Sequence, residues 1–180
     1  MDSGAAGIIS NRNLQRIKLP SILFVCTANR FRSPIAAISF AREVVRHDDD
    51  HLIQISSAGT WTVIGQPATT EAIQEANKYR LNLSLHKSRP ITREILSQAD
   101  LVLVMESNHK EAISHEFPFI ADRIFLLSEA VNGSTYDIPD PYASDESPKA
   151  IAHEIVTMLD RGYDQIFKLA LAKSHRSEEL

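Results

Sequence analysis

A cysteine, an arginine and a serine stand in an order that could bind and transfer a phosphoryl group. The only cysteine of the chain, Cys26, ends an apolar run, and Arg32 follows six positions later with Ser33 directly behind it. A thiolate is a strong nucleophile, and a guanidinium can bind two phosphoryl oxygens through planar donors. The Ser33 hydroxyl could donate a hydrogen bond to the sulfur. We expect an oxyanion-binding loop here, although a core cysteine that completes a strand is the plain alternative.

A general acid is also needed, because the oxygen that leaves phosphorus must take up a proton. Asp140 stands between Pro139 and Pro141, which restrict its backbone and could hold the carboxyl group over the loop. Asp137 is the rival acid, and an ordinary Asp-Pro turn is the structural alternative. Tyr142 would form an aromatic wall for a flat substrate, or would pack on the loop as a surface tyrosine.

The elements that must position these residues alternate along the chain, as in a parallel sheet flanked by helices. Apolar runs predict strands at residues 21–25, 53–57, 101–105 and 123–127, and the alternating second run predicts an edge strand. Ligands of an open α/β sheet gather at the carboxyl ends of the strands, where Cys26 stands. Asn29 tolerates left-handed backbone and could hold the loop amides inward.

Helical periodicity predicts the segments between the strands. The first helix would begin with Ser33 as its N-cap and Pro34 at its first position, and would continue through Val45. Further helices are expected at residues 69–80, 92–98 and 107–115. The last helix is predicted as one element from Ser147 to residue 171, because its apolar period continues across Gly162.

The composition limits the class of protein. The chain has 180 residues, with 19 Lys and Arg against 23 Asp and Glu, so its net charge of −4 argues against a nucleic-acid partner. A single cysteine excludes an intramolecular disulfide and a four-cysteine metal site. Residues 1–20 lack the apolar centre of a signal peptide, and no stretch predicts a membrane span. We expect a cytoplasmic protein with a mobile tail at 1–20 and a single domain at 21–180.

Six stretches stand in order along the chain: Val25-Cys26-Thr27-Ala28-Asn29-Arg30-Phe31-Arg32-Ser33-Pro34, Ser57-Ala-Gly-Thr60, Gly65-Gln-Pro67, His86-Lys-Ser-Arg89, Ala99-Asp-Leu-Val-Leu-Val-Met105 and Pro139-Asp140-Pro141-Tyr142. Taken together, these motifs resemble the low-molecular-weight protein tyrosine phosphatases. The resemblance implies a flavodoxin-like α/β fold, a three-layer sandwich with a four-stranded parallel sheet. It also implies a phosphotyrosine protein substrate, no metal or other cofactor, and a reaction through a phosphocysteine.

The resemblance also implies a role for each of these positions. Cys26 would be the nucleophile, Arg32 would bind the phosphate, and Asp140 would act first as acid and then as base for water. The residues implied to hold the loop are Asn29, Ser57 and His86. The residues implied to contact the substrate are Thr27, Ala28, Asn29, Arg30, Phe31, Ser33, Trp61 and Tyr142.

Four positions need separate comment, three of them departures from the family pattern. Ala28 replaces the usual glycine and would be strained only if its φ were positive. Phe31 replaces a second cysteine, so oxidised Cys26 could not be trapped as a disulfide. Arg30 replaces a small or aliphatic residue; facing the pocket it would favour extra negative charge and disfavour phosphoarginine, and facing outward it would be solvated. Trp61 could form the other wall of the cleft or could be half-buried core.

Two other functions use similar residues. An arsenate reductase-like enzyme binds oxyanions in the same kind of loop, but its redox cycle needs further cysteines, and this chain has one. A catalytically weak phosphoprotein-binding module would keep Arg32 while losing the nucleophile or the acid, and both Cys26 and Asp140 are present. A phosphatase with such a pocket should be inhibited by phosphate or vanadate.

Overall fold

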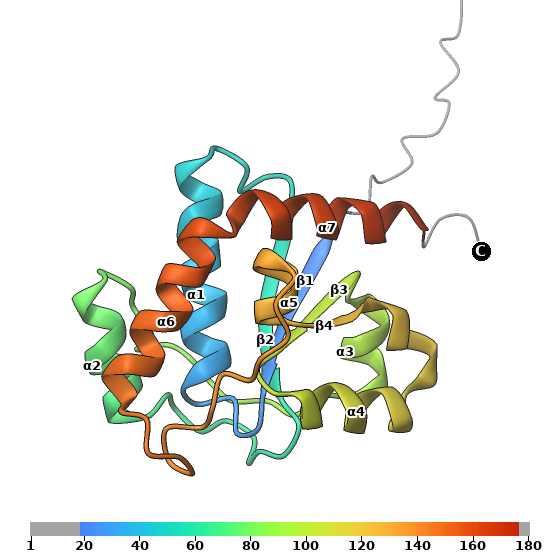
Figure 1. Ribbon diagram of the computed structural model, residues 1–180. Helices are drawn as coiled ribbons and strands as arrows, with labels where there is room; N and C mark the ends of the chain where they lie inside the picture. The colour runs from blue at the N-terminus through green and yellow to red at the C-terminus, as the bar shows by residue number, and fades with distance from the viewer. Residues whose placement is uncertain (1–18, 177–180) are drawn as a thin grey trace, which may run out of the picture.

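Four parallel strands form the centre of the molecule. A computed structural model describes residues 19–176, and in it the strands pair in the order β2-β1-β3-β4 (Figure 1). Every pairing is parallel, with Val25 opposite Ala58 on one side and Val104 on the other. The predicted edge position of the second strand is therefore confirmed. The strands are β1 (Ser21–Cys26), β2 (Gln54–Gly59), β3 (Leu101–Val104) and β4 (Ile124–Leu126).

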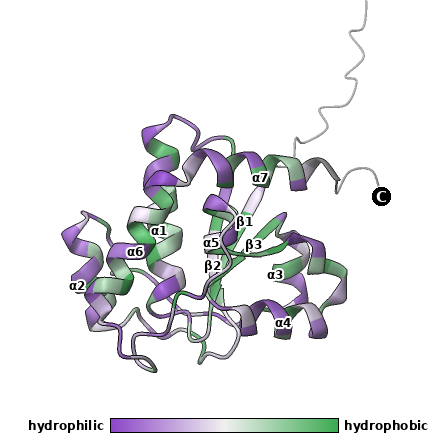
Figure 2. Ribbon diagram, viewed as in Figure 1, coloured by the Kyte–Doolittle hydropathy of each residue, from purple (hydrophilic) through white to green (hydrophobic). Residues whose placement is uncertain are grey.

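Helices cover both faces of this sheet and make the three layers that the resemblance implies. One core packs Ile22 and Phe24 against the helices of the first face, and the other packs Leu23 and Val25 against those of the second face. In Figure 2 the hydrophobic colour is clear on β3, one of the two central strands. The first face carries α1 (Arg32–Arg46), α2 (Thr70–Lys78), α5 (Leu127–Asn132), α6 (Pro148–Arg161) and α7 (Tyr163–Arg176), and the second carries α3 (Arg93–Gln98), α4 (Ser107–Glu116) and the 3-10 helix η1 (Pro118–Arg123).

Two helix predictions are wrong. The chain does not form one helix from Ser147 onward, because α6 ends at Arg161 and Gly162 separates it from α7. A Cβ on Gly162 would lie 2.6 Å from a methyl carbon of Val131, so the two helices and α5 meet too closely for a side chain there. The start of α1 also differs. Ser33 lies inside the helix, and the N-cap position belongs to Phe31, whose side chain makes no capping hydrogen bond.

Several element ends differ by a few residues from the prediction. The fourth apolar run was expected to be strand from Arg123 to Leu127, but Arg123 ends η1 and Leu127 begins α5. The expected tail at 1–20 lies outside the described residues except for its last two. Among residues 19–176, none of the helices is long and apolar enough to cross a membrane.

Candidate active site

The loop between β1 and α1 encloses the cysteine. Cys26 is the last residue of β1 and its side chain is buried, while Arg32 opens α1. The Cys26 Sγ lies 3.1 Å from Ser33 Oγ, which is the contact with the sulfur that the sequence predicts for this serine. At this distance the Ser33 hydroxyl can donate a hydrogen bond to the sulfur.

Asn29 holds the loop in shape from its centre. Its φ of 53° is left-handed, as expected, and its side chain is fully buried. The Asn29 amide nitrogen donates to Ser33 Oγ and to Ser57 Oγ, both at 2.9 Å. Its amide oxygen accepts from the backbone nitrogen of Arg89 at 3.0 Å. The loop is thereby tied to β2 and to the segment after α2.

His86 supports the same residue from the other side. Its Nε2 lies 2.7 Å from the backbone oxygen of Asn29 and is placed to donate to it. Partial burial lowers the pKa of His86, the hydrogen bond to Asn29 opposes this, and the positive charge of Arg89 adds to the lowering. The neutral ring therefore suffices to hold the loop. The structure thus brings together Asn29, Ser57 and His86, the three residues expected to support it.

Close backbone packing shapes the outer side of the loop. Ala28 does not have a positive φ, so the alanine that replaces the usual glycine is unstrained. Its backbone oxygen accepts a hydrogen bond of 2.6 Å from Thr62 Oγ1. Gly59, at the end of β2, has no room for a side chain because a Cβ there would lie 2.5 Å from the backbone oxygen of Thr27. Gly59 is thus part of the site, and the Ser-Ala-Gly-Thr motif was its signal.

Arg32 is buried between two carboxylates. Its Nη1 donates to Glu106 Oε2 at 2.7 Å and to the backbone oxygen of Ile138 at 2.9 Å. Its Nη2 donates to Asp140 Oδ2 at 2.6 Å. The side chain is only 1% exposed, so its position is fixed by these partners. The guanidinium is therefore oriented before any ligand arrives.

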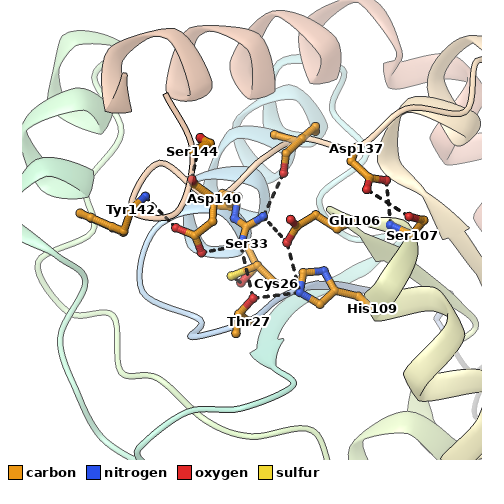
Figure 3. A network of polar contacts seen from close by, with 12 residues as sticks. Cys26, Thr27, Ser33, Glu106, Ser107, His109, Asp137, Asp140, Tyr142 and Ser144 are labelled. Carbon is orange, nitrogen blue, oxygen red and sulfur yellow. Dashed lines mark hydrogen bonds and ion pairs between the residues drawn. The ribbon is translucent and has the colours of Figure 1, made fainter. Parts of the chain in front are cut away.

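The two candidate acids face different ways. Asp140 lies beside Arg32, and its Oδ1 accepts from the backbone nitrogen of Tyr142 at 2.9 Å. Asp137 accepts from the backbone nitrogen of Ser107 at 2.8 Å and from its hydroxyl at 3.0 Å. Figure 3 shows Asp137 turned to the start of α4, away from the sulfur. The geometry favours Asp140 as the acid and gives Asp137 a role in holding α4.

Two adjoining cavities open above the loop. They share Ala28, Arg30 and Asp140, and the Arg30 Nε donates to the backbone oxygen of Pro67 at 2.9 Å. Arg30 therefore lines the site and is anchored at its rim. The smaller cavity, about 130 Å³, is lined by Cys26, Ala28, Arg30, Phe31, Arg32, Thr69, Asp140 and Tyr142. The larger, about 630 Å³, is lined by Thr27, Ala28, Arg30, Trp61, Thr62, Val63, Gln66 and Asp140.

Aromatic side chains form the walls of these cavities. Tyr142 meets the buried Phe31 edge to face, with ring centres 6.0 Å apart. The Tyr142 hydroxyl contacts Thr69 Oγ1 at 2.8 Å, and burial raises the pKa of Tyr142, so the hydroxyl stays protonated. Trp61 is 84% exposed, so it is not core, and it borders the larger cavity.

Sequence reasoning missed two polar residues of the site, Glu106 and His109. Glu106 stands two residues after the end of β3, and the carboxyl ends of parallel strands meet at one edge, which was a usable signal. His109 lies buried one helical turn later, with its Nε2 2.9 Å from Thr27 Oγ1. In the part of the chain that the structure describes, no group of three or more His, Cys, Asp or Glu side chains is placed to hold a metal ion.

Known proteins share this arrangement. Residues 21–177 match the family model described as low molecular weight phosphotyrosine protein phosphatase. The chain is 36% identical over 121 residues to the protein-arginine-phosphatase of Bacillus subtilis, which covers 67% of this chain and 79% of that protein. It is 31% identical over 145 residues to the low molecular weight protein-tyrosine-phosphatase Wzb of Escherichia coli K12, covering 81% and 91%.

A solved structure agrees with the sequence matches. The tyrosine phosphatase Wzb from Escherichia coli K30, crystallised in complex with sulphate, superposes with a TM-score of 0.72 and 31% identity. The superposition covers 82% of this chain and 99% of Wzb. With the family match over nearly all described residues, the chain belongs to the low molecular weight phosphotyrosine protein phosphatases.

Proposed function

We propose that this protein hydrolyses phosphotyrosine in proteins, with Cys26 as nucleophile, Arg32 as phosphate ligand and Asp140 as general acid and base. The observation that carries the proposal is that all three side chains line one small cavity. The narrow cavity, with Tyr142 on its wall, suits a flat aryl ester whose phosphate reaches the loop. Arg32 and the loop amides would bind phosphate or vanadate as inhibitors.

The reaction takes place in two displacements. The Cys26 thiolate attacks phosphorus, the bond from phosphorus to the tyrosine oxygen breaks, and protonated Asp140 gives its proton to the departing oxygen. Water then attacks the phosphorus of the phosphocysteine, while the Asp140 carboxylate takes a proton from this water molecule. The phosphorus–sulfur bond breaks, inorganic phosphate leaves, and the thiolate is restored. Because the thiol must stay reduced, we propose that the enzyme acts in the cytoplasm.

A hydrolysis assay with a matched pair of aspartate variants tests this proposal. We expect p-nitrophenyl phosphate and a phosphotyrosine peptide to be hydrolysed in the presence of a chelator, and Cys26→Ser to abolish turnover. Asp140→Asn should impair turnover, whereas Asp137→Asn should leave it close to wild type because Asp137 binds Ser107 at the start of α4. Turnover that survives Cys26→Ser would refute the proposal.

Phosphoarginine is the second candidate substrate, because a relative at 36% identity is named a protein-arginine-phosphatase. Arg30 opposes it here. A phosphoarginine side chain carries its own guanidinium, which would approach the like charge of Arg30 in the cavity. We therefore expect phosphotyrosine peptides to be preferred over phosphoarginine and phosphoserine peptides of the same sequence.

The Arg30→Ile variant tests the role of that charge. If Arg30 excludes phosphoarginine, the variant should raise kcat/KM for the phosphoarginine peptide relative to the phosphotyrosine peptide. A wild-type preference for phosphoarginine, unchanged by Arg30→Ile, would show that the charge does not determine the choice of substrate.

A further inference from the structure

His109 is a buried histidine that contacts the phosphate-binding loop and has no part in the function proposed above. Its side chain is 5% exposed, on α4, and its Nε2 lies 2.9 Å from Thr27 Oγ1. The other ring nitrogen, Nδ1, is buried with no hydrogen-bond partner. In Figure 3 the ring lies next to Thr27 and Glu106. A buried polar group beside the reacting atoms needs an explanation.

The surroundings of the ring select one tautomer. A hydrogen on Nδ1 would be a buried donor without an acceptor, which is rarer and more costly than an unpaired acceptor. On the other side, Glu106 Oε2 lies 3.5 Å from Nε2. A carboxylate attracts an N–H group there and repels a lone pair. Both observations place the single hydrogen of a neutral His109 on Nε2.

His109 is neutral at physiological pH. Burial lowers its pKa, and the charge of Arg32 lowers it further. The carboxylates that face the ring, Glu106, Asp137 and Asp140, raise the pKa, but burial is the largest of these effects. The ring therefore offers one N–H donor to its surroundings, and Thr27 lies within reach of it.

The Thr27 hydroxyl then faces two donors. His109 Nε2–H donates to its oxygen at 2.9 Å, and Arg32 Nη2 approaches the same oxygen at 3.4 Å. The hydroxyl hydrogen must therefore point to a third group. We propose that His109 is a positioning residue that turns the Thr27 hydroxyl hydrogen toward the substrate phosphoryl oxygen bound at Arg32, which makes Thr27 a side-chain ligand of the phosphate. This inference rests on the proposed function.

Inhibition by inorganic phosphate tests the role of the hydroxyl. Thr27→Val keeps the shape of the side chain and removes the donor. It should raise the Ki of phosphate roughly tenfold and the KM of p-nitrophenyl phosphate in parallel, as expected for a lost hydrogen bond to a charged group. Thr27→Ser restores the hydroxyl and should bring the Ki back to within about threefold of wild type. An unchanged Ki in Thr27→Val would overturn the proposal.

A double-mutant cycle tests the link to the histidine. His109→Phe should raise the Ki of phosphate in wild type and have no further effect in T27V, because the hydrogen bond is already lost there. His115→Phe, on the exposed side of the same helix, is the matched control and should change neither value. Equal effects of His109→Phe in both backgrounds would show a merely structural role. Thermal unfolding verifies that each variant is folded.

The tautomer can be observed directly by nitrogen NMR of the His109 ring. We expect a protonated Nε2 and an unprotonated Nδ1 near neutral pH, and the opposite assignment would overturn the inference even if His109→Phe does not fold. The two proposals can fail separately. If the wild type shows no hydrolysis that depends on Cys26, the proposed function is refuted. If hydrolysis depends on Cys26 but the Ki of phosphate is unchanged in T27V, only the role of Thr27 and His109 is refuted.

Discussion

Replacing Asp140 by asparagine should weaken catalysis and strengthen phosphate binding in the same protein. The Asp140 carboxylate is both the proposed general acid and a partner of Arg32 Nη2 at 2.6 Å. Asparagine cannot donate a proton to the leaving oxygen, so turnover of phenyl phosphate should fall by roughly 10²- to 10⁴-fold. The loss should be smaller for p-nitrophenyl phosphate, whose leaving group needs less protonation.

The gain in phosphate binding follows from charge. A carboxylate and a phosphate oxygen about 5 Å apart repel each other by roughly 1–3 kcal/mol at an effective dielectric constant between 80 and 20. Asp140 is 26% exposed, which places the value toward the lower end of that range. About 1–2 kcal/mol of relieved repulsion corresponds to a Ki of phosphate lowered by roughly 5- to 30-fold.

Steady-state kinetics with three aryl phosphates of increasing leaving-group acidity, together with phosphate inhibition, measure both effects. Asp137→Asn is the control, since it removes a neighbouring carboxylate that binds Ser107 rather than Arg32. Equal loss for all three substrates, or a Ki that rises in Asp140→Asn, would refute the assignment of Asp140 as the acid that shares Arg32 with the phosphate.

Three further outcomes follow from individual contacts. Glu106→Gln weakens one of the two ion pairs of Arg32 and should lower kcat/KM for p-nitrophenyl phosphate roughly tenfold, so an unchanged value would contradict the contact. Burial lowers the pKa of His86 below 6.5, so the unfolded chain binds more protons and the free energy of unfolding should fall from pH 7 to pH 5. Urea unfolding should show a flatter pH dependence in His86→Asn. Gly162→Ala forces a Cβ within 2.6 Å of Val131 and should destabilise the fold by about 1–3 kcal/mol in urea unfolding, without changing kcat.

The sheet and the loop were predictable because their signals are local. β1 and β3 are apolar runs buried on both faces, and a continuous apolar run predicts a central strand without information about its neighbours. Cys26 and Arg32 are six positions apart, so one stretch of chain contains the loop that they frame. Asn29 was recognisable in the same way, because its left-handed backbone is a property of its own residue type.

The break at Gly162 was not predictable from local signals. The apolar period continues from α6 into α7, and glycine within a helical pattern is only a modest penalty. What separates the helices is the close approach of Val131, on α5, and a sequence pattern carries no information about that neighbour. α5 was itself missed, because Leu127 continues the apolar run of β4.

The polar support of Arg32 was hidden for a related reason. Glu106 is 74 residues away from its partner, and His109 is 82 residues away from Thr27. Helical and strand periodicity relate residues only a few positions apart, so neither contact could be predicted from such a pattern. Of the two roles predicted for Ser33, the contact of its hydroxyl with Cys26 is present, together with a hydrogen bond from Asn29, but Ser33 does not cap the helix.

The two carboxylates around Arg32 also affect how substrate reaches the site. Two carboxylates, Glu106 and Asp140, face Arg32, and Arg30 lines the same cavity, so these four side chains carry little net charge, while the whole chain carries −4. A dianionic phosphate therefore meets no long-range field that would speed its approach, and capture should depend only weakly on ionic strength. Selection among phosphorylated partners is then made after contact, through how long each one stays bound.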